Sequence, residues 1–313
     1  MSIAYVFPGQ GSQYEGMGLD FFLSFAEAAQ IFARADEALG FMLSDLCFEG
    51  PEGELNKTVN TQPAILTASI ACLEVFRRAG APAPAALAGH SLGEYTALVA
   101  AGSLGFEDAV RLVRKRGQYM QEAVPLGTGG MAAVMGLSGA GVIDLCLRAS
   151  EKGVVEAVNL NCPGQVVVAG DMDGLQAAQV LAKEAGAKRF IPLSVSAPFH
   201  SRLMAPAGEK LARDLAEIEI LEPKVGVVAN VSADYVRSAS EVRESLNKQV
   251  YSPVRWEDSI RRMIADGVDT FIEIGPGKVL SGLIKKISRE VKIYNIEDQA
   301  SLEKILALQG EVS

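Results

Sequence analysis

Several features are scarce in this sequence. The 313 residues include only four cysteines, which are Cys47, Cys72, Cys146 and Cys162. They are scattered without CxxC spacing, so neither a disulfide framework nor a zinc site is indicated. No apolar run approaches the roughly 18 to 20 residues of a membrane helix. The first residues, Met1 to Tyr5, also lack the basic and apolar regions of a signal peptide. We therefore expect a soluble cytoplasmic protein with reduced thiols and no membrane association.

Positive charge is also scarce. Lys and Arg total 29 against 38 Asp and Glu, which makes the formal net charge −9. Proteins that hold phosphate backbones present basic faces, so this balance argues against nucleic acid as the main partner. An anionic ligand would need a local basic patch within an acidic background.

Apolar residues, by contrast, are plentiful. They make up 49% of the chain, while charged residues make up 21%. These values are typical of globular chains, because disordered chains have few apolar side chains and a high net charge. A chain of this length is expected to form two domains, or one large domain that carries a smaller inserted one.

Strand and helix patterns alternate along much of the chain, and no repeat is present. Pro63 lies near the first helical position of a long apolar stretch, which predicts a buried helix. Such alternation predicts an α/β fold with a largely parallel sheet that is covered on both faces. The expected strands are 3–7, 85–89, 225–228, 270–274 and 291–296, and the expected helices are 63–76, 94–101, 201–219 and 256–265, with a short helix at the end.

Shorter elements follow one another between residues 127 and 196. Their expected order is strand 131–137, helix 140–151, strand 154–159, strand 165–169, helix 172–185 and strand 189–195. This order is the ferredoxin-like βαββαβ pattern. We therefore predict a ferredoxin-like subdomain at 127–196, inserted into a main domain formed by 1–126 and 197–313.

A G-x-S-x-G motif lies between an expected strand and an expected helix. It reads Gly89-His90-Ser91-Leu92-Gly93. The glycines on either side allow a sharp turn without a Cβ clash, which would hold the Ser91 hydroxyl clear of the backbone. The backbone N–H of Leu92 would then point at an oxyanion formed by attack of Ser91. The alternative is a chance pentapeptide in a chain with 31 glycines.

A serine nucleophile needs a base, which is most often histidine. The chain has only two histidines, His90 and His200. His90 adjoins the serine, and neighbours at a sharp turn point their side chains in different directions. His200 follows an X-Pro step, which places it on a loop where catalytic residues are common. His200 is therefore the candidate base, against the alternative of a structural histidine.

Seven short motifs follow one another over essentially the whole chain. Together they resemble the malonyl-CoA:acyl carrier protein transacylase family. They are Phe7-Pro8-Gly9-Gln10-Gly11-Ser12-Gln13, Thr61-Gln62-Pro63-Ala64, Gly89-His90-Ser91-Leu92-Gly93-Glu94-Tyr95, Arg116-Gly117-Gln118-Tyr119-Met120, Asn161-Cys162-Pro163-Gly164-Gln165, Pro198-Phe199-His200-Ser201 and Pro253-Val254-Arg255-Trp256. The resemblance implies an α/β-hydrolase-like main domain with the inserted ferredoxin-like subdomain, and a cleft between them.

The resemblance also implies roles for residues around the substrate. The backbone N–H groups of Gln10 and Leu92 would form the oxyanion hole. The carbonyl of Gln249 would orient His200 in place of a carboxylate. Arg116 would bind the malonyl carboxylate, although on the pattern alone it is more simply a solvated charge beside Arg111, Arg114 and Lys115 on a helix face. Phe199 resembles the residue found in malonyl-specific members.

The function implied is transfer of a malonyl group from malonyl-CoA to the phosphopantetheine thiol of acyl carrier protein, through an ester on Ser91. Fatty acid biosynthesis is the expected pathway, and a polyketide pathway is the alternative. No cofactor is expected, and we expect a monomer. Two other readings are a serine thioesterase or esterase, which uses water as acceptor, and a silent docking domain that kept the fold.

Overall fold

The computed structural model describes residues 2–125, 127–195 and 197–310. Its larger sheet has six strands in the order β10-β9-β1-β2-β7-β8. All neighbouring pairs are parallel except β7 and β8. The strands are β1 (Ile3–Phe7), β2 (Ala86–Gly89), β7 (Val227–Val228), β8 (Tyr235–Val236), β9 (Thr270–Ile274) and β10 (Lys292–Ile296). The predicted, largely parallel sheet is therefore confirmed.

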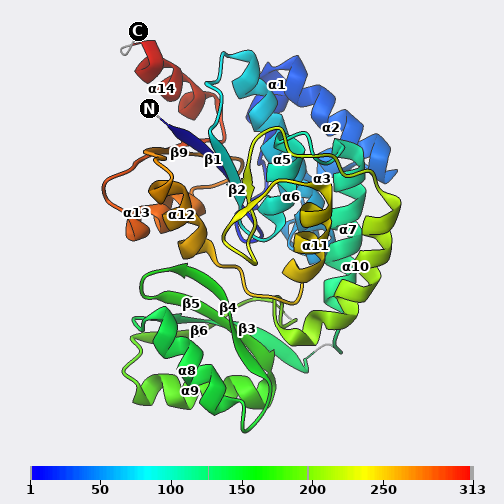
Figure 1. The fold of residues 1–313 in the computed structure, drawn as a ribbon. Coiled ribbons are helices and arrows are strands. Elements are labelled where there is room, and N and C mark those ends of the chain that lie inside the picture. Colours follow the sequence, from blue (N-terminus) through cyan, green and yellow to red (C-terminus); the bar gives the residue numbers. More distant parts are fainter. Residues whose placement is uncertain (1, 126, 196, 311–313) are drawn as a thin grey trace.

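Helices cover both faces of this sheet (Figure 1). Tyr5 and Phe7 of β1 pack into the apolar core formed with α2, α5, α6, α7, α10 and α11, whereas Ala4 and Val6 pack against α12 and α13. Residues therefore alternate between two buried faces, as expected for a central parallel strand. The helices are α1 (Leu19–Ser24), α2 (Ala26–Leu39), α3 (Leu43–Glu49), α4 (Glu52–Leu55), α5 (Thr58–Arg78), α6 (Leu92–Ala100), α7 (Phe106–Glu122), α10 (Ala205–Glu217), α11 (Ala239–Gln249), α12 (Trp256–Ala265), α13 (Val279–Ile287) and α14 (Gln299–Gly310), with a 3-10 turn at Arg202–Met204.

Helix α5 begins earlier than its sequence predicts. It starts at Thr58, so Pro63 lies in the interior of the helix and not at its first position. Residues that precede the helix stabilise its first turn. The N–H of Thr61 donates to the carbonyl of Lys57, and the hydroxyl of Thr61 donates to the carbonyl of Leu55. A proline at this depth leaves one carbonyl without its intrahelical donor. Because α5 begins at Thr58, Gln62 lies within the helix, and the helix fixes the position of the Gln62 side chain at the site described below.

A second, antiparallel sheet lies beside the first and has helices on one face (Figure 1). Its strand order is β4-β5-β3-β6. Its elements follow the order βαββαβ, as predicted: β3 (Gly129–Met135), α8 (Gly139–Ala149), β4 (Val155–Cys162), β5 (Gln165–Asp171), α9 (Met172–Glu184) and β6 (Arg189–Pro192). The predicted boundary residues 126 and 196 lie outside the described residues, as do 1 and 311–313.

Strand β4 ties the second sheet to the rest of the molecule. The N–H of Leu160 donates to the carbonyl of Val254 at 2.9 Å, and the N–H of Val254 donates to the carbonyl of Val158 at 2.8 Å. Val254 is fully buried and lies just before α12. Backbone hydrogen bonds therefore fix β4 against the larger sheet's helical layer. Within the described part of the chain, no helix combines the length and the apolar character needed to cross a bilayer.

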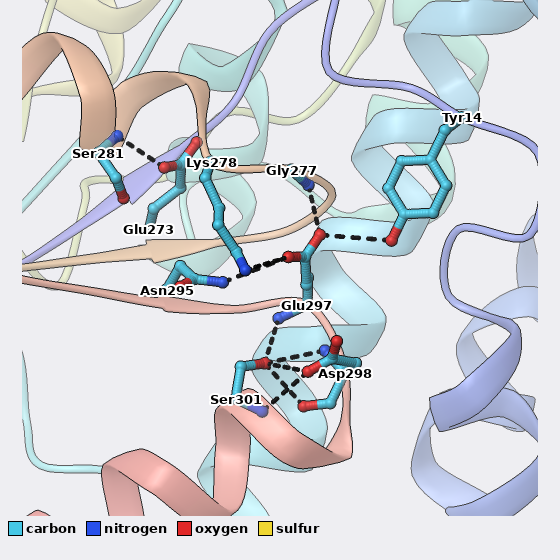
Figure 2. Close-up of polar contacts among 9 residues, drawn as sticks. All are labelled: Tyr14, Glu273, Gly277, Lys278, Ser281, Asn295, Glu297, Asp298 and Ser301. Carbon is cyan, nitrogen blue, oxygen red and sulfur yellow. Dashed lines mark hydrogen bonds and ion pairs between the residues drawn. The ribbon is translucent and has the colours of Figure 1, made fainter.

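The loops that follow β1, β9 and β10 meet at one end of the larger sheet (Figure 2). Glu297 joins them: its carboxylate accepts from the Tyr14 hydroxyl at 3.3 Å and from the N–H of Gly277 at 2.8 Å, and it forms an ion pair with Lys278 at 3.2 Å. Tyr14 belongs to the loop that follows β1. The carboxyl ends of parallel strands are where open α/β sheets bind ligands, and Glu297 holds this edge together.

Candidate active site

Ser91 lies at a sharp turn between β2 and α6. A Cβ on Gly89 would lie 1.9 Å from the backbone of Gly93, and a Cβ on Gly93 would lie 2.1 Å from the carbonyl oxygen of Phe7. Ser91 itself has φ 50° and ψ −108°, which L-residues rarely adopt. The two glycines are thus required by close packing of strand, turn and helix, and the strained conformation falls on the serine.

The structure brings Ser91 and His200 together across 109 residues of sequence. The Oγ of Ser91 lies 2.7 Å from Nε2 of His200, and Nδ1 of His200 lies 2.7 Å from the carbonyl oxygen of Gln249. A carbonyl only accepts, so Nδ1 carries the proton and Nε2 of the neutral ring is free to accept from the serine hydroxyl. This tautomer is the one that a general base requires. The carbonyl of Gln249 takes the place of a carboxylate.

Burial keeps His200 in its neutral form. It is 3% exposed, and desolvation, followed by the positive charge of Arg116, lowers its pKa to about 3. A histidine with a lowered pKa stays neutral, and its free nitrogen can still accept a proton, at pH values below the ordinary histidine pKa of about 6.5.

In a Glu94→Gln enzyme, we expect the rate of Ser91 acylation to stay level as pH falls from about 8 to about 5, because the pKa of the His200 imidazole is lowered to about 3. A solvated histidine would lose about tenfold per pH unit below about 6.5. Rapid-quench measurements with malonyl-CoA would give the profile. Burial also raises the pKa of Glu94 to about 7, so Glu94→Gln is the variant that removes a second titration from this range. A single ionisation near 6.5 that persists in Glu94→Gln contradicts the prediction.

The loop after β1 packs directly against the turn that carries Ser91. A Cβ on Gly9 would lie 2.4 Å from the carbonyl oxygen of His90. The next residue, Gln10, is held by a hydrogen bond from its Nε2 to Oγ1 of Thr58 at 3.1 Å. Gln10 and Leu92 line the same cavity as Ser91, and within the described residues neither backbone N–H has a hydrogen-bond partner. Two free donors beside a nucleophile are suited to an oxyanion.

Arg116 is a buried cation next to Ser91. It is 1% exposed. Its Nη1 donates to Oε1 of Gln62 at 2.7 Å, and its Nη2 donates to Oε1 of Gln249 at 2.9 Å and to Oγ of Ser91 at 3.1 Å. Its guanidinium carbon lies 5.3 Å from the centre of the Tyr95 ring. Among the residues described, no carboxylate forms an ion pair with it, and its Nε has no partner.

The three basic neighbours of Arg116 on α7 lie elsewhere. Arg111 pairs with Asp108, and Lys115 pairs with Asp214. Arg114 lies over the ring of Phe41. All three reach solvent or the protein surface, whereas Arg116 alone turns inward. The simpler reading from the sequence, a solvated charge on a helix face, is therefore wrong for Arg116.

A cavity of about 100 Å³ opens beside Ser91 between the two sheets. The larger sheet's layer contributes Ser91, His200 and Arg116, and the smaller sheet contributes Met131 of β3 and Asn159 of β4. The remaining wall is largely apolar: Leu92, Met120, Leu193, Val195 and Phe199. Its size suits a small acyl group, and Arg116 is the charged group that can meet an acid on it.

His90 points away from the serine hydroxyl. Its Nε2 lies 2.8 Å from Oδ1 of Asn161 in β4, and its ring lies edge-on to Trp256, with ring centres 5.6 Å apart. His90 therefore links the turn to the smaller sheet. It does not contact the Ser91 hydroxyl, which agrees with its rejection as the base.

Three buried polar residues at the site, Gln62, Glu94 and Asn230, were not singled out from the sequence. Gln62 accepts a hydrogen bond from Arg116, and Oδ1 of Asn230 accepts from the backbone N–H of Ser91 at 2.7 Å. Gln62 belongs to a family motif, which was a usable signal. Asn230 sits between Ala229 and Val231 in an ordinary apolar stretch, where no local pattern marks it. In the described part of the chain, no group of three His, Cys, Asp or Glu side chains is placed to hold a metal ion.

Comparisons with known proteins show which proteins the chain resembles. A family model described as an acyl transferase domain matches residues 4–306. The malonyl CoA-acyl carrier protein transacylase of Bacillus subtilis (strain 168) is 52% identical over 308 residues, covering 98% of this chain and 96% of the relative.

Two solved structures are similar over the whole chain. An acyl-carrier-protein S-malonyltransferase from Burkholderia pseudomallei 1710b superposes with a TM-score of 0.96 at 48% identity, covering 98% of this chain and 100% of that one. A malonyl-transacylase in complex with its type II polyketide-synthase acyl carrier protein also gives 0.96, at 46% identity and with the same coverage. With a near-complete sequence match and a shared fold, the chain belongs to the malonyl CoA-acyl carrier protein transacylase family of acyl transferases.

Proposed function

We propose that this protein transfers the malonyl group of malonyl-CoA to the phosphopantetheine thiol of acyl carrier protein, through an ester on Ser91. The observation that carries the proposal is Arg116. It is a buried cation that forms no ion pair with a carboxylate in the described part of the chain, although the buried Glu94 lies near enough for its charge to act on it, and its Nη2 lies 3.1 Å from the nucleophilic oxygen. A guanidinium in a dry site strongly favours a ligand that brings its own carboxylate.

In the first half-reaction, Nε2 of His200 takes the Ser91 proton as Oγ attacks the thioester carbonyl. The N–H groups of Gln10 and Leu92 would stabilise the oxyanion. When the tetrahedral intermediate collapses, the C–S bond breaks and the imidazolium returns the proton to the sulfur of coenzyme A. The product is a malonyl ester on Ser91, with the malonyl carboxylate on Arg116.

In the second half-reaction, the carrier protein's thiol gives its proton to Nε2 of His200 and attacks the same carbonyl. The C–O bond to Ser91 then breaks, and His200 returns the proton to Oγ. The free enzyme is restored. Two half-reactions through one covalent state predict ping-pong kinetics.

The test of this function separates transfer from hydrolysis. Malonyl-CoA and phosphopantetheinylated carrier protein are mixed with the enzyme, and malonyl-carrier protein and free malonate are both measured. Transfer much faster than hydrolysis supports the proposal. Dominant release of malonate identifies a thioesterase, and the absence of both products and of any covalent adduct identifies a silent docking domain.

Arg116→Ala is expected to reduce kcat/KM for malonyl-CoA by about 10²- to 10⁴-fold, because the malonyl carboxylate loses its charged partner in a buried site. Acetyl-CoA carries no carboxylate, so its kcat/KM should change much less. The ratio of the two kcat/KM values, measured with the same carrier protein, is the quantity to follow.

Arg114→Ala is the matched control for Arg116. It removes a guanidinium two positions away on α7, whose Nη1 bonds Asn60 outside the site. Its malonyl-to-acetyl ratio should stay at the wild-type value. If Arg116→Ala lowers kcat/KM for both thioesters equally, Arg116 does not select the acyl group.

The remaining parts of the proposal concern setting and assembly. We propose a cytoplasmic, cofactor-free monomer, and light scattering on the purified protein would give its mass. We also propose that residues 127–196 form an inserted domain within 1–126 and 197–313. Fatty acid biosynthesis is the proposed pathway, so malonylation of a fatty-acid-type carrier protein should be faster than that of a polyketide-type one.

A further inference from the structure

Asn230 follows β7 at the point where its neighbour β2 turns into the Ser91 loop. The register pairs Leu87 with Val227 and Ala88 with Val228, so residue 230 would face His90 if the pairing continued. In a parallel ladder, the backbone N–H and C=O of that residue would bond the carbonyl of Gly89 and the N–H of Ser91.

The side-chain amide of Asn230 makes these two bonds instead. Its Nδ2 donates to the carbonyl oxygen of Gly89 at 2.7 Å, and its Oδ1 accepts from the N–H of Ser91 at 2.7 Å. The backbone of Asn230 is thereby free for other partners: its N–H donates to Oε2 of Glu94 at 2.9 Å, and its carbonyl accepts from the N–H of Arg255 at 3.0 Å. The amide thus extends the sheet ladder past the end of the strand.

Glu94 and Gln249 complete a clamp around Ser91. Nε2 of Gln249 donates to the carbonyl oxygen of Ser91 at 2.9 Å and to Oε2 of Glu94 at 2.8 Å. Glu94 therefore holds both Asn230 and Gln249 through one oxygen. Glu94 is 1% exposed, and Asn230 and Gln249 are fully buried. Both backbone polar groups of Ser91 are bonded to side chains from the segment 230–249.

These bonds have a consequence for the nucleophile. Ser91 has an unfavourable φ of 50°, which persists only where the surroundings impose it. Because Asn230 takes the N–H of Ser91, that donor is turned away from the cavity, while the N–H of Leu92 stays free. The clamp also sets the direction of the Cα–Cβ bond, and hence the 2.7 Å contact between Oγ and His200.

We propose that Asn230, held by Glu94, is a positioning residue that sets the strained backbone of Ser91, so that its hydroxyl meets His200 and only the following N–H faces the oxyanion. This inference rests on the proposed function for its kinetic readout. The alternative is a buried asparagine that contributes to folding alone.

The first test is Asn230→Ala. We expect the rate of Ser91 acylation by malonyl-CoA to fall about 10²-fold, as for small misplacements of a reacting group, while KM for malonyl-CoA stays within about threefold. Asn295→Ala is the control. Asn295 (Figure 2) lies on β10, and β9 and β1 separate β10 from β2 in the sheet. A folded Asn230→Ala enzyme with wild-type acylation overturns the proposal.

The second test is Asn230→Asp, which preserves the shape of the side chain. A neutral carboxyl can accept from the N–H of Ser91 and donate to the carbonyl of Gly89, as the amide does, whereas a carboxylate cannot donate. Burial and the nearby Glu94 favour the neutral form of the introduced acid, against the opposing charge of Arg116. The His200 base stays neutral across this range, because its pKa is lowered to about 3. Burial raises the pKa of Glu94 to about 7, so Glu94 titrates in wild type as well as in the variant, and the ratio of the two activities is the quantity compared.

Activity of Asn230→Asp relative to wild type should therefore recover as pH falls from about 8 to about 5.5, reaching within about fivefold of wild type. A role confined to folding would leave this ratio flat, and a flat ratio with a large loss, or no loss at any pH, overturns the proposal. Circular dichroism at each pH confirms that the compared enzymes are folded.

A serine-directed fluorophosphonate separates this inference from the proposed function. The probe forms a P–O bond to Ser91 and releases fluoride, so its reaction needs the serine and His200 but no malonyl pocket. Slower labelling of Asn230→Ala, with pH-dependent recovery in Asn230→Asp, supports positioning even if malonyl transfer fails in wild type. Labelling at the wild-type rate in both variants overturns it.

Discussion

Replacing Ser91 with alanine is expected to abolish the covalent malonyl-enzyme and, with it, all transfer to carrier protein. The Ser91 hydroxyl contacts both Nε2 of His200 and the Arg116 guanidinium. Without it, a ping-pong path has no covalent state. Intact-protein mass spectrometry after brief exposure to malonyl-CoA would show the adduct on wild type and none on Ser91→Ala.

Ser103→Ala is the matched control for Ser91. Ser103 is also buried, but its hydroxyl donates to the carbonyl of Leu221, away from the cavity. Its adduct should form at the wild-type rate. An adduct of malonyl mass that persists on Ser91→Ala would falsify the assignment and move the nucleophile to another side chain.

His200→Ala should leave Ser91 in place but remove its base. We expect acylation to slow by at least about 10³-fold, since general bases contribute 10²- to 10⁴-fold and a nucleophile and base act as a unit. Binding of malonyl-CoA should be affected far less, because Arg116 keeps its contacts with Gln62 and Gln249. Single-turnover acylation at saturating malonyl-CoA isolates the chemical step.

Added imidazole provides a sharper test of this role. The space left by the ring lies in a cavity that already borders Ser91, so imidazole should restore part of the acylation rate of His200→Ala and none of that of Ser91→Ala. His90→Ala is the comparison for the second histidine. If it costs more than His200→Ala in the acylation step, the proton goes to His90 and the proposed geometry does not describe the reaction.

Much of the fold could be predicted from local sequence patterns. Strand β1 and strand β9 coincide with their predicted bounds, and the predicted order of the second sheet is confirmed. Strand β1 is a run of five apolar residues followed by Pro8, and β9 is a mostly apolar segment followed by Gly275; such signals act over short distances. Pro63 misled the prediction of α5, because Thr58 to Gln62 lack an apolar periodicity that would mark a helix start.

The candidate site could be predicted only in part from the sequence. Ser91 stands out because G-x-S-x-G is a local requirement for a tight strand-to-helix turn, and His200 stands out because the chain offers just two histidines. The sequence of α7 could not predict that the Arg116 side chain points inward. Four basic residues lie between 111 and 116, and any of them could be exposed to solvent. Only the packing of α7 against α5 and α6 decides which of them turns inward.

The sequence by itself determined the largely parallel sheet covered by helices, the βαββαβ order of the second sheet and the sharp turn at Ser91. It also limited the candidate bases for the Ser91 hydroxyl to two histidines. The tertiary structure alone decided that Asn230, Glu94 and Gln249 surround that turn and that Arg116 lies unpaired by any carboxylate among the described residues. Those contacts join positions up to 158 residues apart. Hydrogen bonds between such distant segments produce no periodic pattern in the sequence. They depend on which strands are neighbours in the sheet, because neighbouring strands end side by side.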